Sequence, residues 1–178
     1  MKIRWRALAS TILLCVFAFG TAGAAESPAP AVGAGGEAPP IELHQPDGKL
    51  FRLSECLSSS KAVVVSMWGI RCGACLDEMK HLNVLHGRYR EKGVTFVGVN
   101  VDGIDAATLA QFLGSMPVRP EYPVVADPAM SVVDSYRMTA VPLTFLIDPK
   151  GAILSRHEGF QEGDEKILES EIRKMVGP

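Results

Sequence analysis

Two cysteines, Cys72 and Cys75, stand in the spacing C-x-x-C, and no other residues in the sequence are better placed to do chemistry. A short apolar run at residues 62–65 precedes the pair and is typical of a strand buried on both faces. From residue 72 to residue 90, apolar side chains recur every three or four positions, which predicts an amphipathic helix. Cys72 should therefore lie at a helix N-terminus, where unpaired backbone N–H groups and the helix dipole favour a thiolate.

We expect Cys72 to be the attacking sulfur and to face solvent. Cys75 falls one turn deeper on the same helical face, where it would resolve a mixed disulfide between Cys72 and a partner. Arg71 directly precedes Cys72 and would favour the thiolate further if its side chain turns toward the sulfur. The pair is thus predicted to form a redox-active disulfide.

Two other uses of the pair stay open. Half of a zinc site is one of them, but zinc needs four ligands and there is no second C-x-x-C. The other candidate ligands are scattered along the chain at Cys56, His44, His81, His86 and His157. A purely structural disulfide is the second alternative, although closing so short a loop would constrain the unfolded chain little. The sequence predicts no metal site.

The elements around the pair alternate between strand and helix patterns. They predict an α/β domain with a central mixed sheet, preceded by a β-hairpin around the turn Pro46-Asp47-Gly48. Strands are expected at residues 62–65, 94–101, 122–125, 144–147 and 153–156, and helices at 72–90, 106–113, 130–136 and 162–176.

The first 25 residues have the pattern of an export signal. Lys2, Arg4 and Arg6 precede an apolar run, and small residues follow it with a cleavage site near Ala24. An uncleaved membrane anchor is the alternative, because the run approaches the length that spans a bilayer. Residues 26–40, rich in Pro, Ala and Gly, are predicted to be a linker, and residues 41–178 a single domain. We expect a periplasmic location for this domain.

The composition excludes several classes of protein. With 47% hydrophobic and 21% charged residues, the 178-residue chain is too apolar to be disordered. The formal net charge is −2, so the chain lacks the basic surface of a nucleic-acid-binding protein.

Two blocks of sequence resemble a known family. The run from Val63 to Met79, with Cys72-Gly73-Ala74-Cys75 at its centre, looks like the strand, active-site loop and helix of thioredoxin-like proteins, and more narrowly of their exported TlpA/ResA/CcmG branch. The block from Val141 to Gly151 is similar to the branch's cis-proline strand and the turn after it. The resemblance covers roughly residue 41 to the C-terminus and implies a thioredoxin-like fold.

The resemblance also implies roles for particular residues. Pro142 would be a cis-proline packed against the disulfide, with an ordinary trans-proline as the alternative. Glu78 would accept the Cys75 proton, unless it is only a first-turn acid favoured by the helix dipole. Contacts with substrate would come from the Val141 backbone, Arg71 and Trp68, although core packing is an equally simple reading of Trp68.

The chain departs from the branch pattern near the active site. Arg71 replaces a tryptophan before the first cysteine, Ala74 replaces a proline before the second, and Lys80 replaces a proline later in the helix. Thioredoxin itself has a buried acid where this chain has Ser66, so proton handling would depend more on Glu78. These changes alter the expected redox tuning and leave the fold intact.

The predicted function is a thiol-disulfide oxidoreductase that reduces protein disulfides without a cofactor. The resemblance implies as substrates the cysteines of apocytochrome c, or the thiols of copper-site proteins during respiratory oxidase assembly, and a membrane electron-donor thiol protein as the source of electrons. The alternatives are a disulfide oxidase or isomerase, a peroxiredoxin, and a copper-binding chaperone with the C-x-x-C sulfurs as ligands. Cys56 is expected to be a small buried residue, or else to form an intermolecular disulfide.

Overall fold

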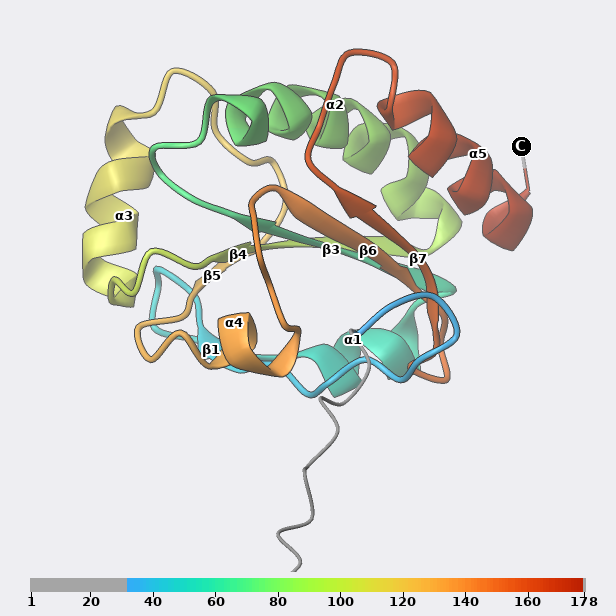
Figure 1. Ribbon diagram of the computed structural model, residues 1–178, viewed down its shortest axis with the longest axis horizontal. Coiled ribbons are helices and arrows are strands. Elements are labelled where there is room, and N and C mark those ends of the chain that lie inside the picture. The colour runs from blue at the N-terminus through green and yellow to red at the C-terminus, as the bar shows by residue number, and fades with distance from the viewer. Residues whose placement is uncertain (1–31, 178) are drawn as a thin grey trace, which may run out of the picture. The chain divides into compact units, whose positions relative to one another are not determined.

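The computed structural model describes residues 32–177, which form a seven-stranded mixed sheet with helices on both faces (Figure 1). The strand order is β2-β1-β5-β4-β3-β6-β7. The strands are β1 (Glu42–His44), β2 (Leu50–Arg52), β3 (Ala62–Trp68), β4 (Val94–Asn100), β5 (Val124–Ala126), β6 (Leu143–Ile147) and β7 (Ile153–Glu158). The helices are α1 (Leu53–Ser59), α2 (Gly73–Tyr89), α3 (Ala106–Ser115), α4 (Ser131–Ser135) and α5 (Glu165–Val176), with a short 3₁₀ turn η1 (Arg90–Lys92) after α2.

The pairing of the strands confirms the predicted mixed sheet. Strands β3, β4 and β5 run parallel, and β6 and β7 add to them in antiparallel fashion. The predicted hairpin forms as β1 and β2, and β1 joins the edge of the sheet through His44 opposite Ala126 on β5. The hairpin therefore extends the central sheet instead of standing apart from it.

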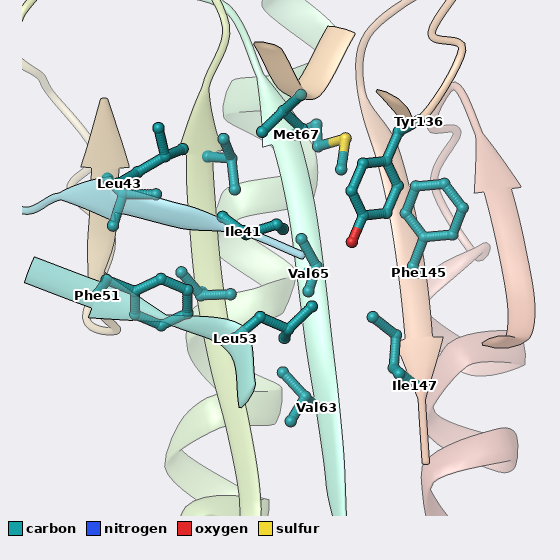
Figure 2. Packing of buried hydrophobic residues seen from close by; sticks show 14 of the residues in the cluster. Ile41, Leu43, Phe51, Leu53, Val63, Val65, Met67, Tyr136, Phe145 and Ile147 are labelled. Carbon is teal, nitrogen blue, oxygen red and sulfur yellow. The ribbon is translucent and has the colours of Figure 1, made fainter. Parts of the chain in front are cut away.

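The central strand β3 is buried over its whole length. Since side chains alternate between the two faces of a strand, Val63, Val65 and Met67 point into one core cluster, together with residues of α4 and the hairpin (Figure 2). Ser66 and Trp68 lie on the opposite face, which α2 covers. In this way the β3 sequence supplies the floor beneath the N-terminal end of α2.

Helices α2 and α5 lie on one side of the sheet, and α1 and α4 lie on the other (Figure 1). Helix α1 was not expected. Its residues Leu53, Cys56 and Leu57 recur at helical spacing and pack against the core cluster that contains Val63, although four of the seven positions are polar.

The predicted linker differs from the structure where the structure describes it. From Val32 the chain runs beside the sheet: the Gly35 N–H donates to the Ile153 carbonyl, and the Ala38 N–H donates to the Gly151 carbonyl. Val32 and Ala38 pack against the core. Backbone hydrogen bonds need no large side chains, so a glycine-rich segment can add to a sheet edge, and the expectation of an unattached linker is wrong for this part.

The predicted signal peptide and the first part of the linker lie outside the described residues. Within residues 32–177, no helix combines the length and the apolar character needed to cross a membrane.

Candidate active site

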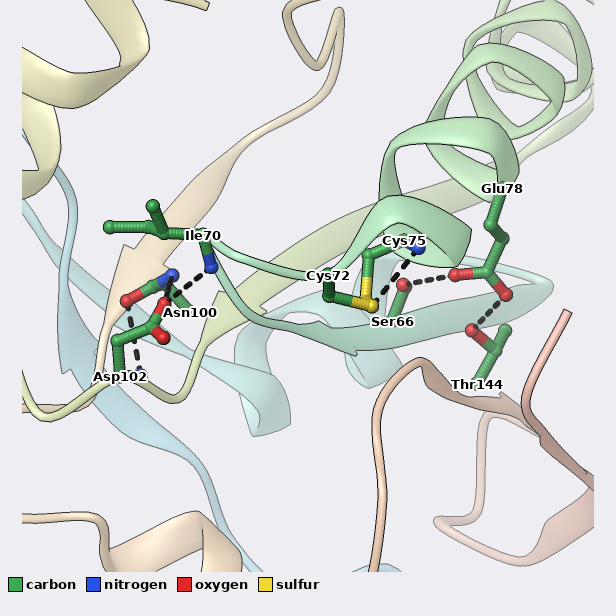
Figure 3. The surroundings of a disulfide bond; sticks show 8 residues. All are labelled: Ser66, Ile70, Cys72, Cys75, Glu78, Asn100, Asp102 and Thr144. Carbon is green, nitrogen blue, oxygen red and sulfur yellow. Dashed lines mark hydrogen bonds between the residues drawn. A yellow bond between two sulfur atoms is a disulfide. The ribbon is translucent and has the colours of Figure 1, made fainter.

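Cys72 and Cys75 form a disulfide at the N-terminus of α2, with their Cα atoms 5.2 Å apart (Figure 3). Cys72 is the N-cap residue in extended conformation, and its Sγ accepts a hydrogen bond of 3.1 Å from the Cys75 backbone N–H. Cys72 is partly exposed, whereas Cys75 is only 1% exposed. The placement matches the predicted division, with an accessible sulfur at the helix dipole and a second one behind it.

The loop before Cys72 is held by a carboxylate from a neighbouring strand end (Figure 3). Asp102 Oδ2 accepts a hydrogen bond of 2.7 Å from the Ile70 backbone N–H and one of 2.6 Å from the Asn100 side-chain amide. A Cβ on Gly69 would lie 3.3 Å from Asp102 Oδ1, so glycine at residue 69 lets the loop approach the carboxylate closely without displacing it.

The sequence patterns did not predict Asn100 and Asp102 as part of the site. A usable signal was present, because both residues are at the carboxyl end of β4, which runs parallel to β3. The carboxyl ends of parallel strands meet at the same edge of a sheet, and that edge is where the C-x-x-C loop begins.

Glu78 lies one turn after Cys75 and is 5% exposed. Its two carboxyl oxygens accept hydrogen bonds from different strands: Ser66 Oγ on β3 donates to Oε2 at 2.9 Å, and Thr144 Oγ1 on β6 donates to Oε1 at 2.7 Å (Figure 3). Ser66 and Thr144 are directly opposite each other in the β3–β6 register. The Glu78 carboxyl therefore points inward over the sheet. An acid that only interacts with the helix dipole at the surface would point to solvent instead.

Burial raises the pKa of the Glu78 carboxyl above its ordinary value of 4.5, while the two hydroxyl groups and nearby His157 act in the opposite direction. A buried carboxyl one turn after a reactive pair, with its pKa moved upward, is a candidate for proton transfer. Ser66 is at the position of the thioredoxin acid, and its hydroxyl donates a hydrogen bond to the Glu78 carboxyl of α2.

The Val141–Pro142 peptide bond is cis, as the resemblance implies, and Pro142 is buried. Val141 is half-buried and packs in the same cluster as Trp68 and Cys75. Arg71 is exposed beside Cys72. The site therefore brings together the C-x-x-C loop, Glu78 and the cis-proline that precedes β6.

Trp68 does not lie where a substrate-binding residue would. Its side chain is 1% exposed and packs beneath the active-site loop with Cys75 and Met79. A buried ring cannot touch a protein substrate, so this placement corrects the predicted contact and agrees with the core-packing alternative.

Cys56 is half-buried on α1 and packs against the core, away from the disulfide. Burial raises the pKa of its thiol, and Glu55 adds to the rise. A thiol that keeps its proton is a poor nucleophile, which favours the expected packing role.

Within residues 32–177, the one group of side chains with the spacing of metal ligands comprises His81, Glu162 and Glu165. Glu162 lies 3.3 Å from Nε2 of His81, and Glu165 lies 3.9 Å from Nδ1 of the same ring. Carboxylates on opposite nitrogens of one imidazole are arranged as ion-pair partners, because a single ion would use only one of those nitrogens.

A mixed sheet, a C-x-x-C disulfide at the start of the helix after its central strand, and a cis-proline strand beside it define the thioredoxin-like thiol-disulfide oxidoreductases, and this chain is an enzyme of that class. The AhpC/TSA family model matches residues 34–156. The chain therefore belongs to the AhpC/TSA family.

Several relatives share the class. The chain is 30% identical over 145 residues to the thiol-disulfide oxidoreductase ResA of Halalkalibacterium halodurans, covering 82% of this chain and 78% of the relative. It is 29% identical over 143 residues to ResA of Bacillus subtilis, covering 80% and 77%. A crystal structure described as the thiol:disulfide interchange protein DsbE from Chlorobium tepidum superposes with a TM-score of 0.72 at 30% identity, covering 81% of this chain and 98% of that one.

Proposed function

We propose that this oxidoreductase works as an exported reductase of protein disulfides. The observation that carries the proposal is the pairing of a partly exposed Cys72 at a helix N-terminus with a buried Cys75 and a buried carboxyl one turn further on. The pattern of residues 1–25 supports export to the periplasm.

The reaction has two exchange steps. The Cys72 thiolate attacks one sulfur of the substrate disulfide, so that a mixed S–S bond forms and the substrate S–S bond breaks. Cys75 then gives its proton to Glu78 and attacks Cys72 as a thiolate, which breaks the mixed bond and forms the Cys72–Cys75 disulfide. Two electrons pass to the substrate, whose two cysteines leave as thiolates and take up protons from water.

The surroundings of Cys75 support the reductive direction. A carboxylate close to a thiol raises the thiol pKa, because it disfavours a second negative charge. A reduced pair that gains little from thiolate formation gives up its electrons more readily, whereas a strongly stabilised thiolate makes an oxidant. Glu78 lies one turn after Cys75 on α2, and a carboxylate at that place would favour a donor of electrons.

The substrate class follows from the resemblance to the TlpA/ResA/CcmG branch. We propose cysteines destined for haem attachment in c-type cytochromes, or the thiols of a copper site under assembly, with a membrane thiol protein as the electron donor. The half-buried Val141 before the cis-proline offers backbone groups against which an extended substrate segment can pair.

Trapping tests the proposal. In Cys75→Ser, a substrate disulfide attacked by Cys72 cannot be resolved, so periplasmic extracts should yield mixed disulfides on Cys72. Cys72→Ser is the matched control and should trap nothing, because Cys75 is 1% exposed. Recovery of no mixed disulfides with Cys75→Ser, or equal recovery with both variants, would contradict the proposal.

A further inference from the structure

A small cavity opens beside the buried carboxyl of Glu78, between α2, β6, β7 and the segment that leads into α5. It has a volume of about 20 Å³, enough for one water molecule, which needs roughly 10–15 Å³. The polar groups in its lining are those a water could bond to: Glu78, His81, Thr144, His157, Asp164 and Glu165.

The lining spans the distance from core to surface. Glu78 is 5% exposed, whereas the side chains of His81 and His157 are 25% and 23% exposed. Both Glu78 oxygens already accept hydrogen bonds from Ser66 and Thr144 inside the sheet layer. A water molecule in the cavity can therefore approach the Glu78 carboxyl from the side on which the cavity lies.

His157 is the best-placed base on this side. It lies directly opposite Thr144 in the β6–β7 register, so the two side chains are neighbours on the same face of the sheet. Its Nε2 is 2.8 Å from Glu171 Oε2 and 3.2 Å from Ser155 Oγ, both partly exposed. An imidazole can accept a proton on one nitrogen and release one from the other, and Nδ1 takes no part in these contacts.

We propose that the cavity is the route by which the Glu78 proton reaches solvent, with one water molecule passing it to His157 and the Glu171 carboxylate drawing it outward. The proposal rests on the proposed function, in which Glu78 takes one proton from Cys75 in each turnover. The proton moves from the Glu78 carboxyl to the water, from the water to His157, and from His157 to bulk water, so Glu78 returns to the carboxylate form.

Other titratable groups also face this carboxyl. They are His81 on α2, Asp164 and Glu165 at the start of α5, and Tyr122 before β5. His81 already pairs with Glu162 and Glu165 at the surface. Tyr122 keeps its proton because burial raises its pKa. His157 is thus the group with both a free nitrogen and an outward carboxylate partner.

A two-phase kinetic experiment tests the route in the reduced chain from Glu26 onward, with Cys56→Ala so that Cys72 and Cys75 are its only thiols. An aromatic disulfide such as 5,5′-dithiobis(2-nitrobenzoate) releases one coloured thiolate when Cys72 attacks and a second when Cys75 resolves the mixed disulfide. Where Glu78 begins protonated, it must lose that proton along the route before it can take the one from Cys75. In His157→Ala and His157→Gln, we therefore expect the first release to be unchanged and the second to slow by about tenfold, with its pH midpoint moved upward because His157 no longer lowers the pKa of Glu78. Added imidazole should restore the second release in His157→Ala.

The controls separate a proton route from a structural role. His44→Ala, on the exposed edge of β1, should leave both releases unchanged. The double variant Glu78→Gln/His157→Gln should be no slower than Glu78→Gln alone, because the route then has no proton to carry. A second release that is unaffected by either His157 change, or slowed by the same factor on top of Glu78→Gln, would overturn the route. Absence of the second release in the unmodified chain would instead overturn the proposed function.

Discussion

In the proposed mechanism, Glu78 accepts the proton that thioredoxin passes to an acid on a different element. The acid of thioredoxin sits on the central strand, where this chain has Ser66. Here the carboxyl belongs to Glu78 on α2 and lies against the same face of the sheet. Ser66 and Thr144 donate hydrogen bonds to its two oxygens. A buried carboxyl is therefore present between α2 and the sheet, although the strand residue at this place is a serine.

The buried carboxyl should make stability depend on pH. Because the pKa of Glu78 is raised in the folded state, the folded protein binds its proton more tightly than the unfolded chain does. Stability is then fully present below the ordinary value of 4.5 and falls as pH rises toward the folded pKa. Compared with Glu78→Gln, the oxidised wild-type chain should lose up to about 1.4 kcal/mol per pH unit in that window.

Urea unfolding of both chains across this pH range measures the difference. Asp77→Asn, which removes an exposed acid one position earlier, is the matched control and should show no comparable trend. A constant free-energy difference between wild type and Glu78→Gln at all pH values would contradict the raised pKa.

At the scale of elements, the close approach of β4 to Trp68 fixes the floor of the site. A Cβ on Gly98 would lie 3.0 Å from Val124 Cγ1 and 3.2 Å from the Trp68 indole nitrogen. Distances this short force the neighbours to move, and overpacking of this kind costs about 1–3 kcal/mol. The absence of a side chain at residue 98 is therefore what lets the buried indole fit.

Two glycine substitutions should move stability in opposite directions. We expect Gly98→Ala to lower the free energy of unfolding by about 1–3 kcal/mol. Gly87 is at an exposed position of α2 with nothing near an added Cβ, so Gly87→Ala should raise that energy by about 0.5–1 kcal/mol through helix propensity. Denaturant titration measures both, and a neutral Gly98→Ala would refute the packing argument.

The elements with strong patterns could be read from the sequence. Helix α2 and strand β3 were found because each repeats one period over many residues. Helix α1 was missed because seven residues hold only two turns and four of them are serine or glutamate. Helix α5 begins at Glu165, three residues later than predicted, because the Gln161 N–H bonds to the Asp164 carboxylate in a turn before it.

The site was only partly predictable for a related reason. Cys72 and Cys75 are close in sequence, so their spacing revealed them. The Ser66–Glu78–Thr144 contacts join residues 12 and 66 positions apart, and such contacts depend on strand register, which periodicity alone does not fix. Asp102 lies at the active-site loop because of a different register, that of the parallel strands β3 and β4.

At the scale of the whole molecule, the segment from Val32 to Pro40 ties the start of the domain to its last strands. Besides its bonds to β7, the Pro39 carbonyl accepts a hydrogen bond of 2.7 Å from the hydroxyl of Tyr136, a fully buried residue after α4. The segment thereby joins two parts of the chain that are almost a hundred residues apart.

Removal of that hydroxyl should loosen the segment. Tyr136→Phe leaves the Pro39 carbonyl without its donor, which should cost about 1 kcal/mol and speed proteolysis within residues 32–40. Tyr89→Phe is the matched control, because it also removes a hydrogen-bonded hydroxyl from a buried tyrosine but on α2. Equal proteolysis of the segment in both variants would contradict its anchoring by Tyr136.

The most direct test of the central claim is the reduction potential of the Cys72–Cys75 pair. It can be followed in dithiothreitol or glutathione buffers through Trp68, which packs with Cys75 and is the only tryptophan in a chain starting at Glu26. Cys56→Ala removes the remaining free thiol. A reductase predicts a potential near or below about −270 mV, the value of thioredoxin. A potential near about −120 mV, the value of a strong oxidant, would contradict the account and make this enzyme a donor of disulfides.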